Sequence, residues 1–194
     1  MLRPGVSTPP PPTSRPYLDA VDRNGRGQAR YELTSFFATP GALSGFVADI
    51  AGHFASKLPT VDAVVGLDAL GFVVAGALGQ KIQKPVILAR KAGKVAMPPE
   101  DVVKTGSYAD YMAVKAGAAE KELEMRRDLL RQGMKVIIVD EWIDTGASMA
   151  AVTRMLESCG VEVVGIGTLQ LTEGRADVAD DLYKRYDVFA ANRE

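Results

Sequence analysis

The chain has 194 residues, of which 47% are hydrophobic, and this is enough apolar material for a full globular core. Its 23 basic and 24 acidic residues nearly cancel, which argues against nucleic acid as a partner. No apolar run approaches the roughly 18 residues that span a bilayer, and the single cysteine excludes an internal disulfide and fits a reducing compartment, so we expect a cytoplasmic protein with no membrane partner.

The amino-terminal segment from Met1 to Ala29 is rich in proline, including Pro9 to Pro12, and has little apolar periodicity. Such a segment cannot offset its ordering entropy, so it is predicted to be a disordered tail. Its arginines leave organellar targeting open as an alternative, although the prolines oppose an amphipathic helix and the apolar core of a secretory signal is missing. We therefore expect the folded domain over residues 30–194.

Ordered structure is predicted to begin at Arg30. Thr39 and Pro40 are typical of an N-cap and a first helical residue. Apolar residues then recur at helical spacing to about Lys57 and predict an amphipathic helix: Leu43, Phe46, Val47, Ile50 and Phe54. His53, the only histidine, borders this stripe and is expected to be a boundary residue, because no second histidine or spare cysteine is available for a His/Cys zinc site.

A strand–turn–helix–strand pattern follows, over Val61–Gly66, Leu67–Gly71, Phe72–Ile82 and Pro85–Ala89. This alternation indicates a parallel sheet with right-handed crossovers, in which ligands gather at the carboxyl ends of the strands. One acid and three basic residues fall at such ends: Asp68, Arg90, Lys91 and Lys94. Beyond them, Ala113 to Leu130 has a helix-forming composition, so propensity alone predicts a helix there.

The most informative stretch runs from Val136 to Gly160. Val136–Val139 is a short apolar, β-branched run that predicts a strand covered on both faces, and Asp140 and Glu141 follow at its end. The loop from Asp144 to Ser148 consists mainly of small residues, and Ser148 is expected to cap a helix from about Met149 to Cys159 that Gly160 terminates. Loop amides, hydroxyls and the positive end of a helix dipole together favour a bound phosphate.

After this stretch, Val161–Leu171 predicts another strand and Arg175–Arg185 a polar closing helix. Cys159, at a helix C-terminus, is expected to be structural.

The run Val136–Ser148 resembles the signature for 5-phosphoribosyl 1-diphosphate (PRPP) in type I phosphoribosyltransferases. The resemblance implies an α/β fold with a mainly parallel central sheet, helices on both faces, a flexible hairpin loop and a small N-terminal hood. It implies that Asp140 and Glu141 hold the ribose hydroxyls and reach Mg²⁺ only through water. The 5′-phosphate loop would comprise Asp144, Thr145, Gly146, Ala147 and Ser148, with Asp144 where the family usually has a small apolar residue.

Two further segments are similar to the adenine phosphoribosyltransferases: the turn Gly66–Phe72 and the basic segment Arg90–Lys94. By that resemblance the leaving pyrophosphate would be held by Asp68, Ala69, Arg90, Lys91 and Lys94. The family usually has an arginine where this chain has Leu70. If one charged hydrogen bond to PRPP is thereby missing, the binding free energy is weaker by about 1.5 to 3 kcal/mol.

The segment Ser107–Tyr111 resembles the mobile catalytic loop of the same family, which favours a hairpin with Glu122–Arg126 as its returning strand over the helix that propensity predicts. Asp110 would then be a catalytic acid or positioning residue near the base, and Tyr111 would help to exclude water. In the hood, Tyr31 would stack on the purine and Glu32 would support the base site.

The function implied is transfer of the 5-phosphoribosyl group from PRPP to a purine, most similar to the adenine enzymes, with Mg²⁺ as cofactor and a homodimer as the assembly. Two alternatives remain. A transferase for xanthine, hypoxanthine or guanine would share the PRPP site and differ in the hood. A PRPP-binding regulator without catalysis would fit the missing arginine and the unusual Asp144, although a DNA-binding domain has no room in residues 1–29.

Overall fold

The computed structural model describes residues 14–22, 32–109, 120–172 and 177–193, with side chains omitted for 177–180. The chain divides into two compact units, Met1–Gly45 and Phe46–Glu194. Within the described ranges, no helix combines the length and the apolar character needed to cross a membrane.

The first unit contains a 3-10 helix, η1 (Pro16–Ala20), and the short helix α1 (Thr34–Ala38). Tyr17 is buried and meets the ring of Phe36 edge-on, with the ring centroids 6.3 Å apart. Backbone hydrogen bonds pair Asp22 with Glu32 in both directions. The structure thus differs from the predicted tail at residues 14–22, because an aromatic side chain there has an apolar partner. The division of the chain at residue 30 stays a prediction.

Helix α2 (Ala42–His53) begins later and ends earlier than predicted. Thr39 is the C-cap of α1 rather than the N-cap of α2, because its N–H donates to the carbonyl of Phe36 while its own carbonyl accepts from Ala42. The predicted apolar stripe is confirmed in the second unit, where four of its members are buried: Phe46, Val47, Ile50 and Phe54.

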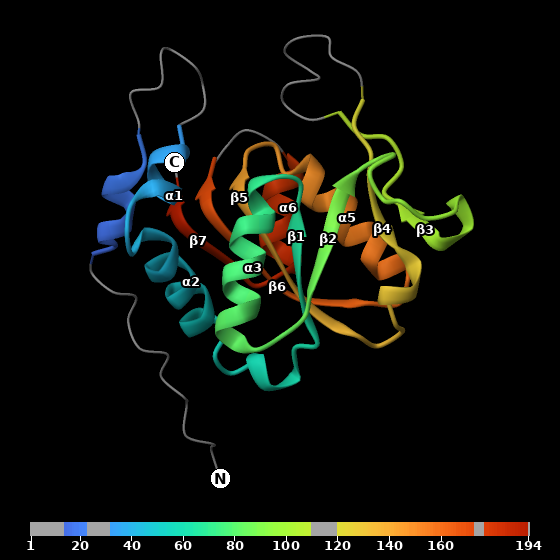
Figure 1. Ribbon diagram of the computed structural model, residues 1–194, viewed down its shortest axis with the longest axis horizontal. Coiled ribbons are helices and arrows are strands. Elements are labelled where there is room, and N and C mark those ends of the chain that lie inside the picture. Colours follow the sequence, from blue (N-terminus) through green and yellow to red (C-terminus); the bar gives the residue numbers. More distant parts are fainter. Residues whose placement is uncertain (1–13, 23–31, 110–119, 173–176, 194) are drawn as a thin grey trace. The chain divides into compact units, whose positions relative to one another are not determined.

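The second unit is built on a seven-stranded sheet in the order β3-β4-β2-β1-β5-β6-β7 (Figure 1). Five strands run parallel, and β4 pairs antiparallel with both β2 and β3. The strand bounds are β1 Ala63–Leu67, β2 Val86–Lys91, β3 Val102–Lys104, β4 Leu123–Arg126, β5 Lys135–Ile143, β6 Glu162–Leu171 and β7 Val188–Arg193. Three 3-10 turns link elements: η2 Leu58–Thr60, η3 Pro99–Asp101 and η4 Arg127–Leu129.

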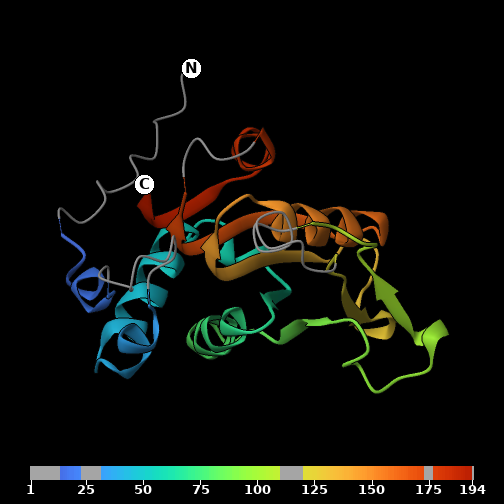
Figure 2. The same cartoon turned by 90° about the horizontal axis from the view of Figure 1, so that it is seen from above.

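Helices cover both faces of this sheet, as Figure 2 shows from above. Helix α3 (Leu70–Ile82) lies on one face, and α5 (Ala147–Ser158) and α6 (Asp177–Arg185) lie on the other. The core between the sheet and α5 is formed by apolar side chains that alternate along the strands, such as Val65, Val136 and Ile138. The predicted α/β class with a mainly parallel sheet is confirmed.

The hairpin predicted from the family resemblance is also confirmed, and the helix predicted from propensity is wrong over residues 120–130. β3 and β4 pair in register from Val102 opposite Arg126 to Lys104 opposite Glu124. Tertiary pairing overrides helix propensity here because Leu123 and Met125 reach the core only from an extended strand.

Strand β7 was not predicted. It follows α6 and pairs parallel with β6, with Val188 opposite Ile166. The residue before it, Asp187, bonds His53 Nε2 at 2.7 Å and Lys57 Nζ at 2.6 Å, which confirms that His53 is a satisfied boundary residue.

Candidate active site

The acid pair lies within β5, which continues to Ile143 rather than stopping at Val139 as predicted. The strand is longer because β6 keeps pairing beside it, with Asp140 opposite Thr168. Asp140 Oδ1 accepts a hydrogen bond from the Glu141 backbone N–H at 2.9 Å. Within the described part of the chain, Glu141 Oε2 is buried and has no hydrogen-bond partner. A buried carboxylate oxygen is costly unless a donor reaches it, so this atom fits a ligand hydroxyl.

The first turn of α3 packs directly against this acid pair. A methyl group in place of the Gly71 hydrogen would lie 2.9 Å from Asp140 Oδ1 and 3.0 Å from the carbonyl oxygen of Val139. Glycine is thus required for the close approach. The turn predicted to bind pyrophosphate and the predicted ribose-binding acids therefore lie next to each other.

The predicted phosphate loop leads from β5 into α5. Gly146 occupies the N-cap position in the left-handed conformation (φ 77°) and its carbonyl accepts from Ala150 at 2.8 Å. The prediction that Ser148 caps the helix is wrong, because the helix begins at Ala147 and Ser148 already lies in its first turn. Thr145 Oγ1 accepts from the Ala147 N–H at 3.3 Å instead. Asp144 is half-buried, and its Oδ2 atom is shielded from solvent.

The predicted pyrophosphate residues lie at the carboxyl ends of β1 and β2. Lys91 Nζ is 3.1 Å from Asp68 Oδ1, and the peptide bond between Asp68 and Ala69 is cis. Arg90 Nη1 donates to the carbonyl of Lys94 at 2.6 Å, so part of its guanidinium already supports the turn. The side chain of Leu70, where the family resemblance implies an arginine, is exposed beside them.

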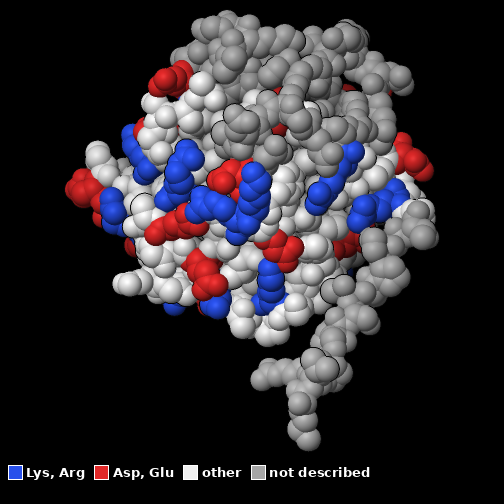
Figure 3. All heavy atoms as spheres, turned by 180° about the vertical axis from the view of Figure 1, so that it is seen from behind, with Lys and Arg blue, Asp and Glu red and all other residues white. Residues whose placement is uncertain are grey.

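The site has acidic and basic parts, but the molecule shows no large surface of one sign on the face drawn in Figure 3, where basic and acidic side chains alternate. Among the described residues, no group of three or more His, Cys, Asp or Glu side chains could hold a metal ion.

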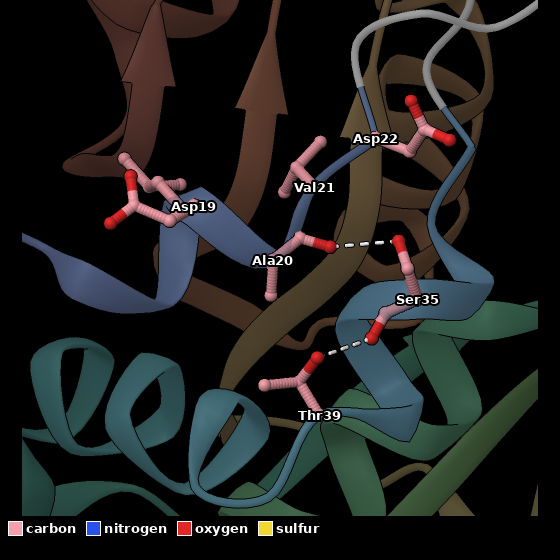
Figure 4. Close-up of a pocket in the computed structure, with 7 residues that line it drawn as sticks. Asp19, Ala20, Val21, Asp22, Ser35 and Thr39 are labelled. Carbon is pink, nitrogen blue, oxygen red and sulfur yellow. Dashed lines mark hydrogen bonds between the residues drawn. The ribbon is translucent and has the colours of Figure 1, made fainter.

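In the first unit, Glu32 supports helix α1. Its Oε1 accepts a hydrogen bond from the Thr34 N–H at 2.6 Å. Hydrogen bonding by the Thr34 side chain, followed by this N–H, holds the pKa of Glu32 below its ordinary value. An open hollow of about 840 Å³ lies nearby, lined by Leu18, Asp19, Ala20, Val21, Asp22, Ser35 and Thr39. Figure 4 shows that the Ser35 hydroxyl points to the carbonyl of Ala20 (2.7 Å) and that Thr39 bonds the Ser35 carbonyl (2.8 Å). Both hydroxyls therefore donate to backbone carbonyls of this unit.

Two predicted residues, Tyr31 and Asp110, lie outside the described residues, as does Tyr111. Their roles stay predictions. Conversely, sequence reasoning missed Glu124, a buried acid on β4. The alternation Leu123, Glu124, Met125 within a predicted strand was the available signal, since it places the acid on the face opposite the core.

Comparison with known proteins places this geometry in a family. The family model described as "Phosphoribosyl transferase domain" matches residues 44–193. An adenine phosphoribosyltransferase of Renibacterium salmoninarum is 36% identical over 143 residues, which cover 73% of this chain and 71% of the relative. One from Clostridium perfringens is 31% identical over 164 residues, covering 84% and 87%.

The fold agrees with solved structures as well. The crystal structure of the adenine phosphoribosyltransferase of Rhodothermus marinus superposes with a TM-score of 0.76 at 22% identity, covering 92% of this chain and 97% of that one. The chain therefore belongs to the phosphoribosyltransferase family, a class of glycosyl-transferring enzymes. Within that family its similarity is to the adenine phosphoribosyltransferases.

Proposed function

We propose that the protein transfers the 5-phosphoribosyl group from PRPP to adenine, giving AMP and pyrophosphate. The observation that carries this proposal is the continuous run from the acid pair on β5 to the N-terminus of α5. It presents a buried carboxylate oxygen of Glu141 that lacks a donor among the described residues, next to a loop with a left-handed glycine and a helix N-terminus. A sugar phosphate with vicinal hydroxyls supplies the missing donor and the anion together.

In this proposal Asp140 and Glu141 accept hydrogen bonds from the ribose hydroxyls, and the loop from Thr145 to Ser148 binds the 5′-phosphate. The C1′–O bond breaks with its electron pair passing to the pyrophosphate. A purine nitrogen bonds to C1′ as its N–H bond breaks, and the proton leaves to the released pyrophosphate or to solvent. The two carboxylates stabilise the positive charge that develops on the ribose during this step. Their fixed positions supply orientation, because Gly71 and the Glu141 N–H hold Asp140 in place.

The pyrophosphate end would contact Lys91 and Lys94. Lys91 is paired with Asp68 at 3.1 Å, and a pyrophosphate oxygen would compete for this ammonium group. Mg²⁺ fits the donor set through substrate oxygens and water near Asp140 and Glu141, where it would neutralise charge on the pyrophosphate. Asp110 is the proposed acid near the base, and Tyr31 the proposed stacking partner.

Adenine is proposed as the base because the two relatives described above are adenine phosphoribosyltransferases. The homodimer, the cytoplasmic location and the domain boundary at residue 30 stay predictions.

Binding of PRPP with Mg²⁺ by calorimetry tests the site directly. Glu141→Gln keeps the size of the side chain but removes its charge and replaces one accepting oxygen with an NH₂ group, which cannot accept a hydrogen bond from a ribose hydroxyl. We expect affinity for PRPP to fall by about tenfold or more, since a charged hydrogen bond is lost, with the melting temperature unchanged or higher. Unchanged affinity, or collapse of the fold, would show that the acid pair is structural.

A further inference from the structure

Glu124 is a buried carboxylate that the proposed reaction does not yet use. It lies on β4 directly between Arg90 on β2 and Lys104 on β3. Its neighbours Leu123 and Met125 face the core with α5, so its own side chain projects from the opposite face of the sheet. Only 3% of the residue is exposed. An acid so deeply buried requires compensating donors.

These donors come from the turn that follows β2. The backbone N–H of Val95 donates to Glu124 Oε1 at 2.7 Å. Burial raises the pKa of Glu124, but hydrogen bonds from the amides of Val95, Gly93 and Lys94, with the charge of Lys104, outweigh burial and leave the pKa below its ordinary value. The carboxylate is therefore ionised at neutral pH.

Arg90 and a hydrogen bond within the turn also stabilise this turn, through its carbonyl groups. Arg90 Nη1 donates to the carbonyl of Lys94 at 2.6 Å, and the Lys94 N–H donates to the carbonyl of Lys91 at 3.1 Å. Glu124 thus accepts the Val95 amide of the turn, while Arg90 donates to the Lys94 carbonyl of the same turn. Because the Val95 amide is directed to Glu124 and the Lys94 amide to the carbonyl of Lys91, neither is available to an anion, and the lysine side chains must provide the contacts.

We propose that Glu124 is a positioning residue for the pyrophosphate group: it fixes the backbone of the turn Lys91–Val95 so that the ammonium groups of Lys91 and Lys94 meet the anion at the carboxyl edge of the sheet. This inference rests on the proposed function. In this role Glu124 acts through the backbone of the turn and does not itself touch the substrate.

The test compares Glu124→Gln with Glu122→Gln. Glu122 lies next to the same strand, and its carboxylate pairs with Lys104 at 3.2 Å rather than with the turn. We expect Glu124→Gln to raise KM for PRPP and Kd for magnesium pyrophosphate by about tenfold, because the amide NH₂ opposes the backbone N–H donors, while kcat changes by less than about threefold. Glu122→Gln should leave all three values within about twofold of the parent.

A double-mutant cycle with Lys94→Ala separates positioning from a general structural role. If Glu124 acts through Lys94, adding Glu124→Gln to Lys94→Ala should weaken pyrophosphate binding by much less than it does alone. Additive effects would overturn the proposal. If Glu124→Gln does not fold, Glu124→Asp retains the charge with a shorter reach. It should still weaken pyrophosphate binding, and unchanged binding would overturn the proposal.

Assays of the parent protein distinguish failure of the positioning role from failure of the proposed function. A parent that makes nucleotide, together with a Glu124→Gln variant of unchanged KM and Kd, would overturn the positioning role alone. A parent that neither makes nucleotide from any purine base nor binds PRPP and pyrophosphate would overturn the proposed function.

Discussion

Gly71, in the first turn of α3, lies so close to Asp140 on β5 that a methyl group in place of its hydrogen would be 2.9 Å from the Asp140 carboxylate. The helix and the acid are thereby locked together. Gly71→Ala should push Asp140 out of position and raise KM for PRPP about tenfold or more, since small displacements of a positioning group cost this much. Steady-state kinetics over a PRPP series would measure it.

The same helix supplies the control. Gly76 has no atom within 4 Å of a substituted methyl group, so Gly76→Ala should fit without displacement. Its expected effect is a stabilisation of about 0.5 to 1 kcal/mol from helix propensity, with kinetics unchanged. Equal losses of activity in both variants would remove the special role assigned to Gly71.

Gly146 is the second position where backbone geometry supports binding. Its φ of 77° at the N-cap of α5 is strained for any residue with a side chain, so Gly146→Ala should cost about 1 to 2 kcal/mol of stability and weaken PRPP binding. Gly133→Ala is the matched control, because Gly133 has a similar φ of 75° and open space around it, away from the acid pair. It should lose comparable stability and keep PRPP affinity. Chemical denaturation and calorimetry together distinguish the two outcomes.

Asp187, just before the C-terminal strand, bonds His53 at the end of α2 and Lys57 beyond it. Burial raises the pKa of Asp187, but hydrogen bonds from Lys57 and His53 lower it by a larger amount, so its folded pKa lies below its ordinary value. The stabilisation that the Asp187 carboxylate gives the folded state is therefore complete above the unfolded pKa of about 3.9. It is lost as pH falls through the folded pKa of Asp187.

Asp187→Asn should accordingly cost about 0.5 to 1 kcal/mol at neutral pH, a small value because the pair is partly solvated. The difference from the parent should shrink in urea titrations as pH falls below about 4. Asp128→Asn provides the comparison, since Asp128 pairs with Arg126 on the open surface and should change stability little. A difference for Asp187→Asn that does not shrink as the solution is acidified would contradict the ion-pair explanation.

Local pattern was sufficient for the centre of the fold. The β-branched run Val136–Val139, the acid pair and the loop to Ser148 lie in one continuous stretch, so the order of strand, acids, loop and helix could be predicted. The hairpin needed the family resemblance, because composition alone favoured a helix there. Ser148 was misassigned as a cap because Gly146 already starts the helix in a left-handed conformation, which composition does not specify.

What could not be predicted depends on contacts between distant segments. Glu124 becomes a buried acid only when a turn 29 residues away covers it. Gly71 matters only because α3 packs against β5, and β7 is a strand because β6 offers it an edge. These are tertiary effects, and a single sequence carries little trace of them.

The measurement that tests the central claim most directly is a product assay. The protein is mixed with Mg²⁺ and PRPP and with adenine, hypoxanthine, guanine or xanthine in separate reactions, and the nucleotide formed is identified. The account predicts AMP and pyrophosphate from adenine, in equal amounts, and their loss in Glu141→Gln. No nucleotide from any base, with PRPP still bound, would contradict it and favour a PRPP-binding regulator.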